Sequence, residues 1–135
     1  GIAGAARHLD STLGVNVPAS KMPDGGWSVF TNHWKDVPDP GELGFWQDNY
    51  DNAMLLGTQN PGFWPASPIV TTSEMWAMDT KIDDGKPATG NVIGVWWQDK
   101  CSSADIGASS STNFASSYAL SNTGNQCAIA FRNFF

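Results

Sequence analysis

Three aspartates in the middle of the sequence, Asp79, Asp83 and Asp84, have the chemistry to bind a hard cation. Ca²⁺ takes oxygen ligands from carboxylates, carbonyls and water, so these side chains are candidate calcium ligands, although their spacing is not that of an EF-hand loop. In the structural alternative, Asp79 pairs with a lysine or caps backbone amides of a neighbouring loop. Asp83 and Asp84 then accept amide hydrogen bonds that fix a turn into Gly85. We favour the structural interpretation, and calcium is the one cofactor that the sequence suggests.

A helix is expected to position these aspartates. Thr71 and Glu74 have the spacing of a capping box, which marks the start of a helix. Apolar residues then recur at spacings of three and four, at Met75, Met78 and Ile82. The sequence therefore predicts a helix from Thr71, followed by a structural turn that contains Asp83, Asp84, Gly85, Pro87 and Gly90.

The two cysteines, Cys101 and Cys127, enclose a serine-rich segment with few residues that could build a core. A disulfide across this segment would stabilise the fold by about 3.5 kcal/mol in the loop-closure model, provided that the compartment is oxidising. The alternative is two buried thiols. We expect the disulfide, and with it an exported protein. The two histidines, His8 and His33, give no zinc-ligand spacing together with these cysteines.

Tryptophan is abundant, with seven residues in the chain. Indole rings stack on sugar faces, so an exposed tryptophan could bind a carbohydrate. Trp46 and Trp76 fall on the apolar faces of predicted helices, where we expect them to be buried. Trp34 and Trp64 lie beside proline-rich loops and are the candidates for exposure and ligand binding.

Composition narrows the possible functions. The 135 residues suit one domain, residues 1–135, and only 15 % of them are charged. A net charge of −6 argues against nucleic acid as a partner, because phosphate binding requires clustered lysine and arginine. Neither His8 nor His33 falls in a nucleophile motif, and we expect no enzymatic activity.

The remaining patterns predict a mixed α+β domain. Residues 1–14 show a helical stripe without an N-cap, which we interpret as the end of a longer helix that begins upstream. Residues 39–57 combine a capping signal with aromatic residues at helical spacing and predict a second helix. We expect strands at residues 26–31, 91–97 and 127–135, and a short strand or helical turn near residues 113–120.

Two phrases in this order resemble type IV pilin-like proteins, a family that includes type II secretion pseudopilins and minor pilins. The first is the aromatic-led FWQDNYDNAMLLG, and the second is MDTKIDDGKPATGNV, which a cysteine follows. The resemblance spans roughly residues 42–101. It is strongest at Asp79, Lys81, Ile82, Asp83, Asp84, Gly85, Pro87 and Gly90.

The resemblance implies an α+β, pilin-like head. It would have a truncated N-terminal helix, one or two short helices and a small antiparallel sheet with a C-terminal disulfide-closed loop. The implied function is a structural subunit of a type IV pilus or type II secretion pseudopilus, assembled through an N-terminal hydrophobic helix upstream of residue 1. Partners would be other pilin or pseudopilin subunits and the inner membrane, and the location would be the bacterial cell envelope. The alternative is a secreted carbohydrate- or ligand-binding module that uses exposed Trp34 or Trp64.

Overall fold

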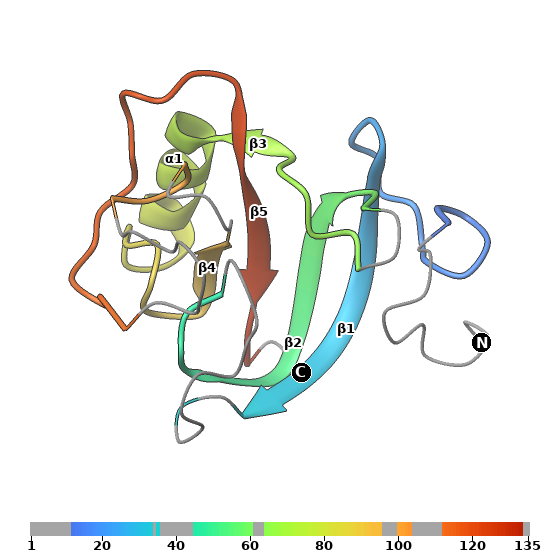
Figure 1. Cartoon of the computed structure of the whole chain (residues 1–135), viewed down its shortest axis with the longest axis horizontal. Coiled ribbons are helices and arrows are strands. Elements are labelled where there is room, and N and C mark those ends of the chain that lie inside the picture. The colour runs from blue at the N-terminus through green and yellow to red at the C-terminus, as the bar shows by residue number, and fades with distance from the viewer. Residues whose placement is uncertain are drawn as a thin grey trace.

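The structure, a computed structural model, describes residues 12–33, 35, 45–60, 64–95, 100–103 and 112–133. These residues form mostly antiparallel sheet with one short helix (Figure 1). In chain order the elements are β1 (Gly25–His33), β2 (Asn49–Thr58), β3 (Val70–Thr71), α1 (Thr72–Ile82), β4 (Val92–Val95) and β5 (Asn125–Phe131). The predicted α+β pilin-like head, with its several helices, was therefore wrong.

The strands pair in the order β1-β2-β5-β3, and β4 also pairs with β5. Every pairing is antiparallel, and Phe131 of β5 lies between Met54 of β2 and Val92 of β4. The β1–β2 register shifts between Phe30 and Asn32, where one residue of β1 faces two residues of β2. The bulge therefore lies in β2, at Asp51 and Asn52, and Asn52 has a φ of 46°. Strand β5 is thus the central strand, and the segment that the two cysteines enclose leads directly into it.

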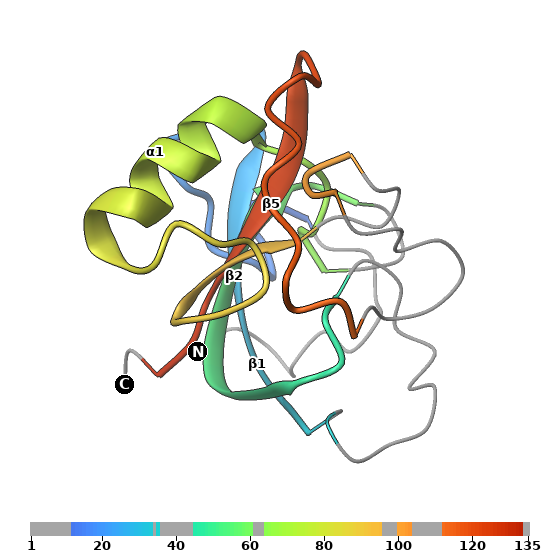
Figure 2. The same ribbon diagram turned by 90° about the vertical axis from the view of Figure 1, so that its left-hand side faces the viewer.

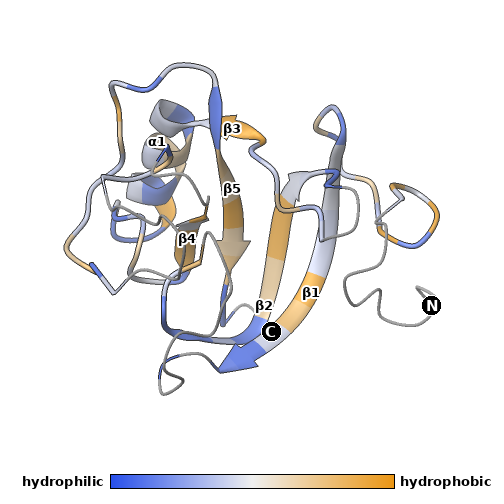
Figure 3. Ribbon diagram, viewed as in Figure 1, coloured by the Kyte–Doolittle hydropathy of each residue, from blue (hydrophilic) through white to orange (hydrophobic). Residues whose placement is uncertain are grey.

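Side chains alternate between the two faces of this sheet and build two apolar clusters. We call the first the aromatic layer; its buried residues are Phe30, Phe45, Trp46, Tyr50, Ala53, Leu55, Ala88, Ile93, Val95, Ala128 and Ala130. The second contains Leu56, Ile69, Val70, Met75, Val92, Cys101, Tyr118, Cys127 and Ile129. Helix α1 packs beside the sheet (Figure 2). Its Met75 is part of the second cluster, so α1 lies on that side of the sheet. The strands carry apolar residues in their central parts (Figure 3).

The helix predicted over residues 39–57 was wrong where the structure describes it, because Asn49–Thr58 is strand β2. Tyr50, Ala53 and Leu55 are buried on one face of the sheet and Leu56 on the other. A run that is apolar on both faces fits a helix and a central strand equally well, and here pairing with β1 and β5 decides the outcome. The capping signal at residues 39–42 lies outside the described residues.

Other local predictions were confirmed. The helix that starts after Thr71 is present with both hydrogen bonds of its capping box. Strands occur at residues 25–33, 92–95 and 125–131, close to the predicted positions. Residues 1–11 lie outside the described residues, and residues 12–17 form a turn with Gly14 at φ 77°, so the predicted helix does not extend through residue 14.

Candidate functional site

Helix α1 delivers the three aspartates to one corner of the molecule. At its start, the Glu74 amide donates to Thr71 Oγ1 at 3.2 Å, and Glu74 Oε2 accepts from the Thr71 amide at 2.9 Å. The Thr71 amide and the Thr71 hydroxyl both donate to the Glu74 carboxylate, which stabilises its charged form and lowers the pKa of Glu74. At its end, the Asp83 amide donates to the Asp79 carbonyl at 2.7 Å. We call residues 79–92 the acidic corner.

Asp79 is fully buried and makes two hydrogen bonds through its carboxylate. Oδ2 accepts from the Tyr118 hydroxyl at 2.6 Å, and Oδ1 accepts from the Gly85 amide at 3.2 Å. Burial raises the pKa of Asp79, although the two hydrogen bonds oppose this shift. The pKa of the Tyr118 hydroxyl is raised as well, first by burial and then by its hydrogen bond to Asp79. The Tyr118 hydroxyl therefore keeps its proton and donates it as a hydrogen bond to α1.

Asp83 fixes the chain as it enters β4. Its Oδ2 accepts from the Val92 amide at 2.8 Å and from the Asn91 amide. Gly90 is required beside it, because its φ of 77° disfavours other residues and a Cβ at this position would lie 2.1 Å from Asp83 Oδ2. The same carboxylate therefore determines both the turn and the small residue that the turn needs.

Asp84 closes the middle of the corner. Its Oδ1 accepts from the Lys86 amide at 2.9 Å, and its Oδ2 accepts from the Thr89 hydroxyl. The Gly94 amide of β4 donates to the Pro87 carbonyl at 3.0 Å. Each of the three aspartates thus binds donors of the same chain, and the predicted structural turn is a hydrogen-bonded connection from α1 to β4.

Arg132 ties this corner to the start of β2. Its Nε donates to the Gly90 carbonyl at 2.6 Å, and its Nη1 donates to Asp48 Oδ2 at 2.6 Å. The side chains of Arg132 and Asp48 are mostly buried, and the guanidinium lies 5.9 Å from the centre of the Tyr50 ring. An arginine that is mostly buried and makes several hydrogen bonds contributes more to the free energy of folding than an exposed ion pair does.

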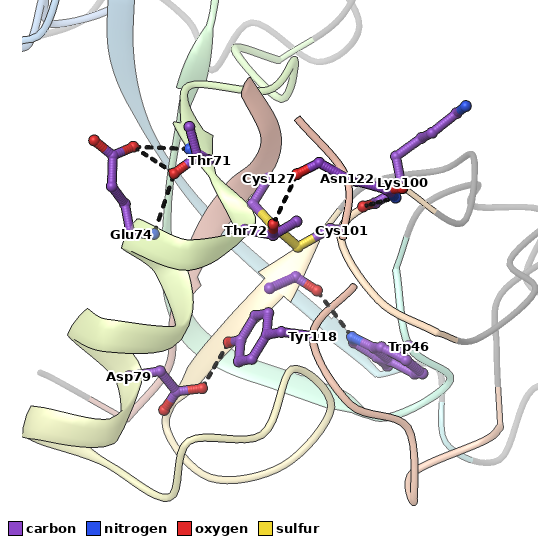
Figure 4. The surroundings of a disulfide bond; sticks show 11 residues. Trp46, Thr71, Thr72, Glu74, Asp79, Lys100, Cys101, Tyr118, Asn122 and Cys127 are labelled. Atoms are coloured by element: carbon purple, nitrogen blue, oxygen red, sulfur yellow. Dashed lines mark hydrogen bonds between the residues drawn. A yellow bond between two sulfur atoms is a disulfide. The ribbon is translucent and has the colours of Figure 1, made fainter. Parts of the chain in front are cut away.

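The disulfide Cys101–Cys127 is present and lies over the start of α1 (Figure 4). From the segment that it closes, Tyr118 reaches Asp79, and the Asn122 carbonyl accepts from Thr72 Oγ1 at 3.4 Å. The disulfide indicates an oxidising extracellular or periplasmic location. Among the described residues, no helix has the length and apolar character needed to cross a membrane.

The three carboxylates lie close enough together to bind one calcium ion, but they already accept hydrogen bonds. One oxygen from each of Asp79, Asp83 and Asp84 lies within 4.8 Å of the other two. Calcium needs six to eight oxygens, whereas the donors that meet these carboxylates are amides and hydroxyls of the corner itself. An ion would have to displace or share these donors, and calcium binding stays a prediction.

The tryptophans are placed differently from the sequence interpretation. Trp46 is fully buried, but in an irregular segment and not on a helix, and its indole donates to the Gly94 carbonyl at 3.1 Å. Trp76 is on α1, yet its side chain is 44 % exposed, against expectation. Trp64 is half-buried and stacks on Phe30 with ring centres 5.4 Å apart. Trp34, like Trp96 and Trp97, lies outside the described residues.

Sequence reasoning missed Tyr118 and Arg132. A buried tyrosine usually finds a partner for its hydroxyl, and that rule was the available signal for Tyr118. Its partner is 39 residues away, and Asp48 is 84 residues from Arg132, so local patterns could not identify either pair.

Comparison with protein-family models, with curated proteins and with solved structures gave no match for this chain.

Proposed function

We propose that this chain is a structural subunit of a type IV pilus or a type II secretion pseudopilus, which works by assembly. The observation that carries the proposal is the acidic corner. The phrase MDTKIDDGKPATGNV, on which the resemblance to pilin-like proteins depends, forms this corner, and its carboxylates bind the amides and hydroxyls of the chain itself. Such a phrase is a determinant of the fold, which supports a structural subunit.

The disulfide supports the same proposal from a different direction. Subunits with heads outside the cytoplasm fold in an oxidising compartment, where Cys101 and Cys127 can pair. The polar segment that they enclose is anchored on α1 through Tyr118 and Asn122. The proposal does not use the predicted helix content, because the sheet-dominated fold corrects it.

The test is the mature N-terminus of the native protein. The protein would be isolated from membrane and sheared surface fractions of its source, then analysed by N-terminal sequencing and intact mass. A methylated first residue, with about twenty apolar residues leading into IAGAARHLD, is the expected result. A conventional signal-peptidase terminus close to residue 1 would contradict the proposal.

A glycan array on the same native protein distinguishes the structural subunit from the alternative function, a secreted ligand-binding module. Trp64 stacks on Phe30, so Trp64→Phe preserves an aromatic contact while it removes the indole. Binding to a sugar that is lost in Trp64→Phe or Trp34→Ala, together with a signal-peptidase terminus, would favour the ligand-binding module. No sugar binding, together with a methylated terminus, would support the structural subunit.

A further inference from the structure

The disulfide is inaccessible in the folded protein. The exposed fraction is 1 % for Cys101 and 0 % for Cys127. Thiol–disulfide exchange requires a thiolate to reach one of the two sulfur atoms, so its rate depends on access. A reductant can therefore act only after some part of the fold opens, and the question is which part opens first.

Tyr118 lies directly beside the disulfide. A Cβ added to Gly94 would be 2.9 Å from Tyr118 Cε1 and 3.0 Å from Cys101 Sγ, so the ring and the sulfur share the space above β4. Figure 4 shows the same ring pointing its hydroxyl toward Asp79 of α1. Movement of Tyr118 away from α1 would open one side of the Cys101 sulfur.

Residues 112–124, which we call the docked segment, contact α1 through two hydrogen bonds in the described residues. The Tyr118–Asp79 bond is buried and 2.6 Å long, whereas the bond from Thr72 Oγ1 to the Asn122 carbonyl is 3.4 Å long. The shorter bond joins a hydroxyl to a carboxyl group. The Tyr118–Asp79 bond is therefore the stronger of the two hydrogen bonds that join the docked segment to α1.

One feature of the docked segment opposes docking. Ser116 is 5 % exposed, and its Oγ atom has no hydrogen-bond partner among the described residues. An unsatisfied buried hydroxyl loses its hydration without compensation. Docking is thus a balance, to which Tyr118 contributes favourably and Ser116 unfavourably.

We propose that the Tyr118–Asp79 hydrogen bond protects the disulfide from reduction. In this proposal, a thiol reductant reaches the disulfide only after residues 112–124 have separated from α1. With a dithiol, one thiolate attacks Cys101 Sγ, the S–S bond breaks, and Cys127 leaves as a thiolate. The second thiol of the reductant then attacks the mixed disulfide and releases Cys101. Two electrons pass to the protein as the dithiol becomes a cyclic disulfide.

The experiment measures the rate at which dithiothreitol reduces the folded, oxidised protein, by alkylation of the new thiols and mass analysis over time. Tyr118→Phe keeps the ring and removes the hydroxyl, and it should accelerate reduction about tenfold or more. Ser116→Ala removes the unsatisfied hydroxyl, and it should slow reduction a few-fold. If the docked segment controls access to the disulfide, these two variants should change the reduction rate in opposite directions.

Phe30→Leu is the matched control, because Phe30 belongs to the aromatic layer on the opposite face of the sheet. All variants are compared at equal global stability by adjusting urea. Tyr118→Phe should then still be reduced faster than Phe30→Leu. Equal rates for these two variants would show that global unfolding exposes the disulfide and would overturn the proposal. An unchanged rate in both Tyr118→Phe and Ser116→Ala would overturn it as well.

Discussion

The acidic corner and the aromatic layer are held together in contrasting ways. In the corner, the carboxylates of Asp83 and Asp84 accept hydrogen bonds from residues that are close in sequence, from Lys86, two positions after Asp84, to Val92, nine after Asp83. The aromatic layer instead joins distant segments, such as Trp46 and Gly94 of β4, which are 48 positions apart. A short phrase can therefore specify the turn at Asp83 and Asp84, whereas the aromatic layer exists only once the sheet has formed.

The two regions also differ in what stabilises them. The corner gains directional hydrogen bonds, each worth about 1 kcal/mol net, and it fixes where the chain turns. The layer gains the burial of large rings, which contributes more free energy and less direction. Substitutions in the layer should therefore cost more stability, and those in the corner should depend more sharply on residue type and pH.

The largest effect is expected in the aromatic layer. Trp46→Ala removes a fully buried ring together with its hydrogen bond to the Gly94 carbonyl, and it should lower the free energy of unfolding by about 3–5 kcal/mol. Trp76→Ala, on the 44 % exposed side chain of α1, should cost less than about 1 kcal/mol. Urea denaturation measures the free energy of unfolding of both variants. Similar losses of stability would contradict the expected difference between the buried and the exposed indole.

The corner should show its own sensitivity at Gly90. Gly90→Ala and Gly14→Ala each place alanine at a φ of 77°, which costs about 1–2 kcal/mol. At Gly90 the new methyl also meets Asp83, and overpacking adds about 1–3 kcal/mol, whereas at Gly14 no atom of the described residues lies within 4 Å of the added Cβ. Thermal unfolding of the two variants measures the difference, and equal losses would contradict the close approach at Gly90.

A smaller effect is expected at the start of α1. Thr71→Ala removes the oxygen that accepts from the Glu74 amide, and it should cost about 1 kcal/mol. Thr123→Ala, on an exposed threonine, serves as the control and should stay within about 0.5 kcal/mol of the wild type. A loss at Thr71 no larger than that at Thr123 would show that the capping box does not stabilise the helix.

The finest distinction concerns pH. The pKa of Asp79 is raised in the folded protein, so the folded state keeps its proton at pH values where the unfolded chain has released it. This contribution to stability is therefore lost as pH rises from about 4 through the raised pKa. In Asp79→Asn the contribution is absent, so the stability of the wild type relative to this variant should fall as pH rises. A relative stability that is flat or rises across this range would contradict the raised pKa.

The same contrast explains how much the sequence could predict. Thr71, Glu74 and the Asp-Asp-Gly turn are local signals, and they correctly located the helix and its end. The disulfide was predictable because only two cysteines were available. The helix predicted over residues 39–57 is wrong from residue 49 onward, because the apolar residues there satisfy both periods and their strand partners are distant in sequence.

Within the candidate site, the aspartates could be predicted but not the residue that buries one of them. Asp83 and Asp84 find donors within the corner, as their types and neighbours suggest. Asp79 is covered by Tyr118, which follows Cys101 in the sequence and reaches Asp79 only through the path that the docked segment takes. The raised pKa of Asp79 is thus a property of the tertiary fold.

The bulge of β2 that faces β1 has a consequence for how the protein behaves when it is concentrated. Strand β1 ends the strand order on one side, and Val29 at its middle is 67 % exposed. A flat, apolar edge strand is a template on which further chains add and aggregate. The register shift between Phe30 and Asn32 interrupts the regular ladder close to Val29, and a bulge bends the strands and increases their local twist. This local bend makes β1 a less regular template for the addition of further strands.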